Sequence, residues 1–185
     1  MHSPEDKSFW VLAGEEKERL FVETVLPRLG FRGCINPAKT NNRYAPDLLV
    51  EGRPADLKCQ RTPFFRAAEL HGVDPQYAVT FNQNDFERYR TDSPSIDIYF
   101  WIHWQQTERQ IGGRRYTVEE MAGVWRASFP ALRNAIEHRS VRSHEYLHRL
   151  FDQAGNAQAS YVFDLRRFEF LGGSPVASDV VAWTT

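Results

Sequence analysis

The sequence contains few cysteines, almost no net charge and no long run of apolar residues. Its two cysteines are too few for a disulfide framework, so we expect a cytoplasmic protein. Acidic residues interrupt positions 1–10, and no run approaches the roughly 20 apolar residues of a membrane span. We therefore predict neither a signal peptide nor a membrane anchor. The formal net charge of −1 excludes a protein held on nucleic acid by bulk charge alone, so any such contact must come from local patches.

The composition is that of one folded domain. Aromatic residues make up 14% of the 185 positions, and a chain of this length buries around 70% of its unfolded surface. We predict a single α/β domain over residues 1–185, with a core over about 12–104. A C-terminal elaboration of helices and strands is expected over about 105–171, and an irregular tail rich in Gly, Ser and Pro over 172–185.

The segment 46–60 predicts two strands joined by a tight turn. Apolar and polar residues alternate strictly from Ala55 to Gln60, which is the period of a strand with one buried face. The polar set should share one face and point away from the core: Asp56, Lys58 and Gln60.

The register of this hairpin places two carboxylates together. If residues 50–53 form the turn, Leu49 pairs with Pro54 and Asp47 lies opposite Asp56, with Cβ atoms about 4.5–5.5 Å apart. Like charges at that distance repel, and a divalent metal between them removes the cost. Lys58 lies one pleat further, where it could hold an attacking water or a developing phosphate charge. A half-exposed hairpin with solvated charges is the other interpretation of the same residues.

The order Pro46-Asp47, then Asp56-x-Lys58, resembles the PD-(D/E)XK nuclease superfamily. That resemblance implies a restriction-endonuclease-like core, in which a mixed central sheet is flanked by helices, and Mg²⁺- or Mn²⁺-dependent hydrolysis of phosphodiester bonds. It implies that Asp47, Asp56 and the backbone carbonyl of Leu57 bind the metal. Lys58 would orient the nucleophilic water, and Gln60 is an auxiliary catalytic candidate.

A helix is expected over residues 14–30, with an acidic first turn and a terminal glycine. Glu18 lies three and four positions before the apolar residues 21 and 22, so it shares their inward face. This arrangement resembles that of nucleases of the superfamily, in which a Gly-x-x-x-Glu helix carries a glutamate that reaches the metal. Glu15 and Glu23 are rivals for that role, and Pro27 should kink or shorten the helix. The expected buried stripe is Phe21, Val22, Val25 and Leu29.

Further elements are expected downstream of the hairpin. We predict a loop over 31–44, a strand over 76–81, a helix over 82–90 capped by an asparagine, and a strand over 96–104. The hairpin and the two strands should form one sheet. Ser128 should cap a helix over about 129–138, and a late strand is expected over 161–165.

DNA is the expected partner, although the residues do not distinguish it from RNA. The sequence also leaves open whether the protein forms a homodimer. No membrane contact is expected. Residues that could contact the phosphate backbone lie in the 31–44 loop, after Lys58 and in the most cationic part of the chain. They are Lys39, Asn42, Arg43, Arg61, Arg142 and Arg149.

A rival motif lies at residues 144–148, where His144, Glu145 and His148 form a literal H-E-x-x-H. On a helix after Ser143 this motif would bind zinc and make the protein a zinc-dependent hydrolase. Charged residues flank it, and a third ligand would have to come from Asp152, Asp164 or Glu169. A basic helix face that lies along nucleic acid is the simpler interpretation. The non-enzyme alternative is a nuclease fold that serves as a nucleic-acid-binding subunit.

Overall fold

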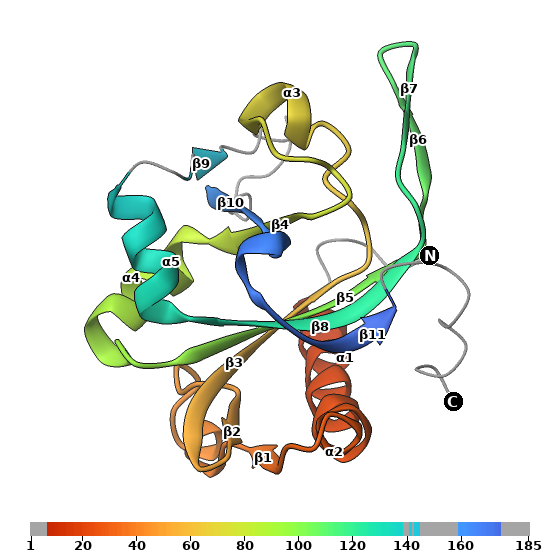
Figure 1. The fold of residues 1–185 in the computed structure, drawn as a ribbon. Coiled ribbons are helices and arrows are strands. Elements are labelled where there is room, and N and C mark those ends of the chain that lie inside the picture. Colours follow the sequence, from red (N-terminus) through yellow and green to blue (C-terminus); the bar gives the residue numbers. More distant parts are fainter. Residues whose placement is uncertain (1–6, 139–140, 142, 145–158, 175–185) are drawn as a thin grey trace. The chain divides into compact units, whose positions relative to one another are not determined.

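The computed structural model describes residues 7–138, 141, 143–144 and 159–174. The chain forms two compact units, residues 1–57 and residues 58–185. Helices and strands occur in both units, so the predicted α/β class is confirmed (Figure 1). Within the described residues, no helix has the length and apolar character needed to cross a membrane.

The first unit begins with one long helical segment. Helix α1 covers Lys7–Leu20, a π-helical turn covers Phe21–Val25, and α2 covers Leu26–Arg28. In the π turn the N–H of Leu26 donates to the carbonyl of Phe21. The helical segment ends at Arg28, one residue after Pro27, which agrees with the prediction that this proline shortens the helix.

The apolar face of this helical segment agrees in part with the predicted stripe. Phe21 and Val25 are buried, whereas Val22 and Leu29 are only half-buried. Leu26, which the prediction omitted, is fully buried. The wider π turn rotates the residues that follow it, which explains why Leu26 faces inward.

The predicted hairpin is present, with its predicted register. Strand β2 covers Leu48–Val50 and β3 covers Arg53–Gln60, and Leu49 pairs with Pro54. The two turn residues have positive φ, 50° at Glu51 and 74° at Gly52. A two-residue turn of this kind matches the twist of the flanking strands. Strand β3 crosses from the first unit into the second at residue 58.

The segment 31–44 is not the loop that was predicted. It contains strand β1, Gly33–Ile35, and a 3-10 helix over Pro37–Thr40. Strand β1 pairs antiparallel with β2 from Gly33↔Val50 to Ile35↔Leu48. A Cβ at Gly33 would lie 2.5 Å from Leu26 Cδ1, so glycine lets this short strand approach the helix closely.

The second unit contains three antiparallel strands, β5 (Asp97–Trp104), β8 (Met121–Ser128) and β11 (Glu169–Ser174). Strand β5 confirms the prediction for 96–104. Strand β11 extends into residues that were predicted to be irregular, because they pair with β8. A separate hairpin, β6 (Glu108–Ile111) and β7 (Arg114–Thr117), projects beyond β5 and β8 (Figure 1).

A second sheet of this unit consists of β4 (Ala78–Asn82), β10 (Ser160–Asp164) and β9 (Ser143–His144). The prediction that residues 77–81 share a sheet with 96–104 is therefore wrong. Strand β4 pairs along its length with β10, which lies some 80 positions later in the chain. The local pattern of a strand does not show which distant segment pairs with it.

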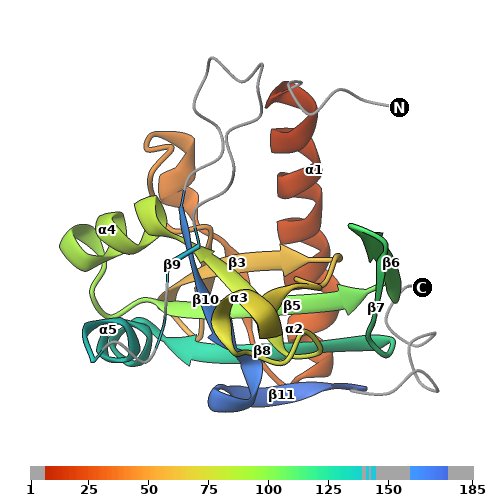
Figure 2. The ribbon, with the colours of Figure 1, turned by 90° about the horizontal axis from the view of Figure 1, so that it is seen from above.

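Two helices of the second unit confirm the capping predictions. Helix α4 covers Gln83–Asp92 and begins at Asn82, whose side chain accepts from the N–H of Asn84. Helix α5 covers Phe129–Glu137 and begins at Ser128, whose hydroxyl accepts from the N–H of Ala131. The two helices lie side by side, with the rings of Phe86 and Phe129 5.3 Å apart (Figure 2). A short helix, α3 (Ala67–His71), and a 3-10 turn over Leu165–Arg167 complete the unit.

The core of the second unit is rich in aromatic side chains. Several of the largest buried residues are rings that are less than 2% exposed, and full burial of such a side chain contributes about 1.5–3 kcal/mol. They are Phe81, Tyr89, Tyr99, Phe100, Trp104, Phe129 and Phe163. These rings pack the interior and are not available to stack on nucleic-acid bases.

Candidate active site

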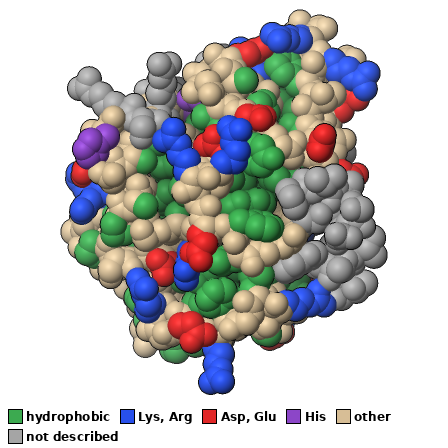
Figure 3. Space-filling model, in the orientation of Figure 1, with side chains coloured by type: hydrophobic (Ala, Val, Ile, Leu, Met, Phe, Trp, Pro, Cys, Tyr) green, Lys and Arg blue, Asp and Glu red, His purple; other side chains and the backbone are tan. Residues whose placement is uncertain are grey.

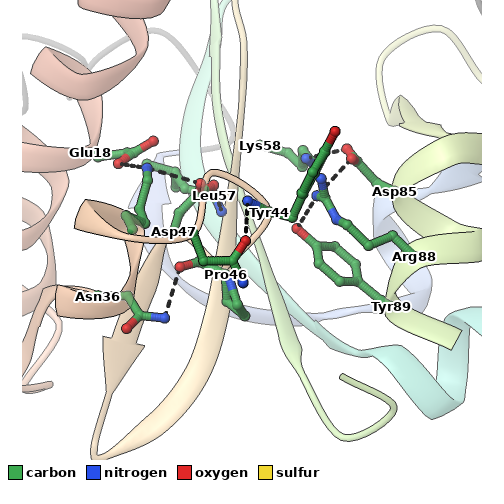
Figure 4. Close-up of polar contacts among 12 residues, drawn as sticks. Glu18, Asn36, Tyr44, Pro46, Asp47, Leu57, Lys58, Asp85, Arg88 and Tyr89 are labelled. Carbon is green, nitrogen blue, oxygen red and sulfur yellow. Dashed lines mark hydrogen bonds and ion pairs between the residues drawn. The ribbon is translucent and has the colours of Figure 1, made fainter. Parts of the chain in front are cut away.

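Two carboxylates of the first unit meet at one ammonium group. Helix α1 supplies Glu18, the 3-10 helix over residues 37–40 supplies Lys39, and the bend before β2 supplies Asp47. Lys39 Nζ lies 2.5 Å from Glu18 Oε2 and 3.2 Å from Asp47 Oδ1. Figure 4 labels the two acidic residues of these ion pairs. We call these three residues the acidic-lysine cluster.

Asn36 holds the lysine segment against the start of the hairpin. Its side-chain oxygen accepts from the N–H of Ala38 at 3.1 Å and so caps the 3-10 helix. Its side-chain nitrogen donates to the carbonyl of Pro46 at 3.0 Å, and its own N–H donates to the carbonyl of Asp47 at 2.9 Å. Asn36 is buried, and three hydrogen bonds fix Lys39 and Asp47 in one local framework.

The ammonium group of Lys39 offsets part of the negative charge of Glu18 and Asp47. Burial alone would lower the pKa of Lys39, but its hydrogen bond to Glu18 and the charges of Asp47 and Glu18 outweigh that effect and raise the pKa above its ordinary value of 10.5. The side chain of Glu18 is 13% exposed, whereas the rivals Glu15 and Glu23 are exposed residues. Among these N-terminal glutamates, Glu18 is therefore the one that lies with Asp47.

Asp47 lies just outside the strand ladder that was used to predict its position. Strand β2 begins one residue later, and Asp47 Oδ2 accepts from the backbone N–H of Leu57 at 3.3 Å. The aspartate therefore binds β3 through its backbone while its other oxygen faces Lys39.

Asp56 differs from its predicted environment. The alternation in β3 placed it on a face that points away from the core, but Asp56 is only 2% exposed, and Ala55 and Leu57 beside it are buried as well. Strand β3 is thus covered on both faces at this point, which a half-exposed surface hairpin would not show. An aspartate that is nearly fully buried is uncommon in proteins.

Lys58 and its partners belong to the second unit. Lys58 Nζ lies 2.7 Å from Asp85 Oδ2, and the other oxygen of Asp85 accepts from Arg88 at 2.8 Å (Figure 4). Arg88 also donates to the hydroxyl of Tyr89. Asp85 lies in the first turn of α4, where the helix dipole favours a carboxylate. The sequence analysis did not find Asp85, although an acidic residue three positions after the cap was a visible signal.

Gln60 makes two bonds to the backbone of Thr80. Its side-chain nitrogen donates to the carbonyl at 2.8 Å, and its side-chain oxygen accepts from the N–H at 3.3 Å. The side-chain amide therefore makes the kind of hydrogen bonds to β4 that a neighbouring strand would make, so Gln60 has a structural role.

The candidate phosphate-binding residues are placed as follows. Asn42 accepts from the N–H of Tyr44, and the guanidinium of Arg43 lies 4.6 Å above the centre of the Tyr44 ring. Arg61 is exposed. Arg142 and Arg149 lie outside the described residues, and Lys39 belongs to the acidic-lysine cluster.

The H-E-x-x-H motif is only partly visible, since Glu145 and His148 lie outside the described residues. His144 belongs to strand β9, so the predicted helix after Ser143 does not include it. Its Nδ1 lies 3.2 Å from His71 Nε2, and burial lowers its pKa below the ordinary 6.5. Two of the proposed third ligands form ion pairs with arginines, Asp164 with Arg166 and Glu169 with Arg126. Asp152 is not among the described residues.

The donor set of the acidic-lysine cluster suits a hard divalent cation. Glu18 and Asp47 offer oxygens that both lie within 3.2 Å of one positive centre. Mg²⁺ is commonly bound by one or two carboxylates together with substrate phosphates. Within residues 7–138 and the shorter described segments, no three His, Cys, Asp or Glu side chains are grouped as a metal site would require.

Comparison with known proteins adds no relative to this description. The chain matches no family model, no curated protein and no solved structure.

Proposed function

We propose that this protein is a metal-dependent nuclease that hydrolyses phosphodiester bonds in DNA through a PD-(D/E)XK site. The observation that carries the proposal is the convergence of Glu18 and Asp47 on one cationic group. The two carboxylates come from the helix and from the hairpin entrance, where the superfamily pattern expects metal ligands. A restriction-endonuclease-like arrangement of the sheet and helices is part of the same proposal.

Glu18 and Asp47 would hold Mg²⁺ or Mn²⁺, with Asp56 and the carbonyl of Leu57 as further ligands by resemblance. The bound ion would supply positive charge that stabilises the negative charge developing on the phosphate. Asp47 is oriented for this role because Leu57 N–H binds its second oxygen. The burial of Asp56 keeps water away from its carboxylate and strengthens its interaction with any cation.

Lys58 would assist the attacking water. It is two residues after Asp56 in β3, and Asp85 holds its ammonium group at 2.7 Å. By the same resemblance, its ammonium would donate hydrogen bonds to the water and to the phosphate oxygens. The water oxygen forms a bond to phosphorus, the bond from phosphorus to the sugar oxygen breaks, and a proton from the water finally rests on the released hydroxyl.

The test is a cleavage assay with supercoiled plasmid in Mg²⁺, Mn²⁺ or EDTA. We expect cleavage by the wild-type protein with Mg²⁺ or Mn²⁺ and none in EDTA. Asp47→Asn and Lys58→Met should each lower the single-turnover rate by about a hundredfold or more. Asp92→Asn removes an exposed carboxylate at the end of α4 and should cleave at the wild-type rate.

The proposal fails if both Asp47→Asn and Lys58→Met cleave as fast as the wild-type protein. Linear, single-stranded and branched DNA, and RNA, should be tested beside the plasmid, because the site residues do not select among these substrates. Activity with Zn²⁺ alone would instead favour the zinc hydrolase that the H-E-x-x-H motif suggests.

A further inference from the structure

We infer that Lys39 is an internal competitor for the metal: its ammonium group occupies the position between Glu18 and Asp47 that a divalent cation would take. This inference rests on the proposed function, because it concerns the same two carboxylates. It adds a residue that lies outside the Pro-Asp and Asp-x-Lys motif, and it assigns that residue a role in controlling the site.

The geometry makes simultaneous occupancy unfavourable. A divalent cation binds carboxylate oxygens at about 2.0–2.6 Å. Lys39 Nζ is 2.5 Å from Glu18 Oε2 and 3.2 Å from Asp47 Oδ1, so the ammonium already lies at the point where both oxygens converge. A metal ion bound to the same two oxygens would lie against this positive charge. Lys39 must therefore leave at least one carboxylate before a cation can bind both.

A hollow beside the cluster offers space into which the Lys39 side chain can move and through which a cation can enter. A hollow of about 560 Å³ opens beside the cluster, and Glu15, Glu16, Glu18 and Lys39 are among the residues that line it. Arg19 lines it as well, so three carboxylates face two basic side chains, and the remaining excess of negative charge favours cations. The side chain of Lys39 is 23% exposed, so rotation about its side-chain bonds moves the ammonium into solvent without disturbing buried packing.

Asn36 keeps this exchange confined to the side chain. Its hydrogen bonds to Ala38, Pro46 and Asp47 fix the backbone on both sides of the cluster. Release of the lysine therefore leaves Asp47 where it is. In the metal-free protein Lys39 offsets one of the two negative charges, and the arriving cation replaces this counter-ion.

The inference is tested by Mn²⁺ binding in the absence of DNA, measured by isothermal titration calorimetry. Lys39→Met removes the competitor and should tighten Mn²⁺ binding by about tenfold or more, the consequence of removing a positive charge next to the ion. Lys39→Arg keeps the charge and should not bind more tightly than the wild-type protein. Lys17→Met removes the same charge from an α1 position outside the cluster and should change affinity less than about twofold.

A second measurement uses the wild-type protein and does not depend on how well the variants fold. Acylation of lysines, read by mass spectrometry, should increase at Lys39 when Mn²⁺ is added and stay constant at Lys17. Asp47→Asn should abolish both the calorimetric signal and the metal-dependent labelling.

The outcomes separate this inference from the proposed function. If the wild-type protein binds Mn²⁺ through Asp47 but Lys39→Met binds no more tightly and Lys39 labelling does not change, Lys39 is not a competitor, and the nuclease proposal stands. If neither protein binds Mn²⁺, or if binding persists in Asp47→Asn, the metal site itself is wrong and both ideas fail.

Discussion

Asp47 has a compensated charge in the structure, because Lys39 lies 3.2 Å from one of its oxygens and Leu57 N–H binds the other. The sequence alone suggested an uncompensated pair of carboxylates, Asp47 against Asp56, and hence a protein strained by repulsion. Lys39 changes the expected balance, and it enters the cluster from a segment whose structure the sequence did not predict.

This difference gives a stability prediction for Asp47→Asn in EDTA. The substitution keeps the shape but weakens the ion pair with Lys39, so the free energy of unfolding should fall by about 0.5–1 kcal/mol. Urea unfolding of the wild-type protein and the variant measures it, with Asp92→Asn as the control that should be neutral. A variant more stable than wild type would mean that repulsion between the aspartates outweighs the ion pair.

Some residues of the site could be predicted from the sequence, and others could not. Glu18 could be predicted because helical spacing alone places it on the apolar face of its helix. Asn36 could not, since its partner Pro46 lies 10 positions away. Asp85 had a local signal as an acidic residue in the first turn of α4, but its contact with Lys58, 27 positions away, had none. The burial of Asp56 was also missed, because alternation within one strand does not reveal whether its other face is covered.

Among the elements, the β2–β3 hairpin was predicted most completely, including its register and turn. Its tight turn forces Glu51 and Gly52 into left-handed backbone conformations, which cost a non-glycine residue energy. Glu51 accepts this conformation while its carboxylate binds the N–H of Arg32 at 2.6 Å. Gly52 is thus the residue on which the turn depends most.

Gly52→Ala should therefore lower the free energy of unfolding by about 1–2 kcal/mol, because alanine at a φ of 74° is strained. Gly14→Ala is the matched comparison: Gly14 lies inside α1 with open space around it, so alanine should stabilise the protein by about 0.5–1 kcal/mol. Denaturant unfolding of both variants should give opposite signs. A Gly52→Ala variant with the same free energy of unfolding as the wild-type protein would contradict the left-handed backbone at this turn.

Elements with strong local signals were predicted, among them the late strand over 161–165, which is β10, whereas the pairing of distant strands was not. Helices α4 and α5 have side-chain caps at Asn82 and Ser128, and β5 contains an unbroken apolar run over 98–102. Strand β1 has only three residues, two of them exposed, and exists because β2 pairs with it. The partnership of β4 with β10 has no local signal at all.

At the scale of the whole molecule, positive and negative side chains are interspersed on the face that Figure 3 shows, in keeping with the net charge of −1. Binding to nucleic acid would therefore depend on a few local contacts. Two histidines of the second unit, His103 and His144, have pKa values lowered chiefly by burial.

These histidines predict a loss of stability in mild acid. Since their folded pKa values lie below the ordinary 6.5, the unfolded chain binds protons first as the pH falls through that value, and the free energy of unfolding decreases. Urea unfolding at pH 7.5 and 5.5 should show this decrease, and His144→Phe should reduce it. An identical decrease in His144→Phe would contradict a role for His144.

The most direct test of the proposed nuclease site compares two glutamates on one helix. Glu18 lies against Lys39 with its side chain 13% exposed, whereas Glu16 is exposed. The measurement is the single-turnover rate of Mg²⁺-dependent DNA cleavage by Glu18→Gln and Glu16→Gln beside the wild-type protein. We predict that Glu18→Gln loses about a hundredfold or more while Glu16→Gln cleaves at the wild-type rate. Equal rates for the two variants, or a greater loss in Glu16→Gln, would contradict the assignment of the metal site.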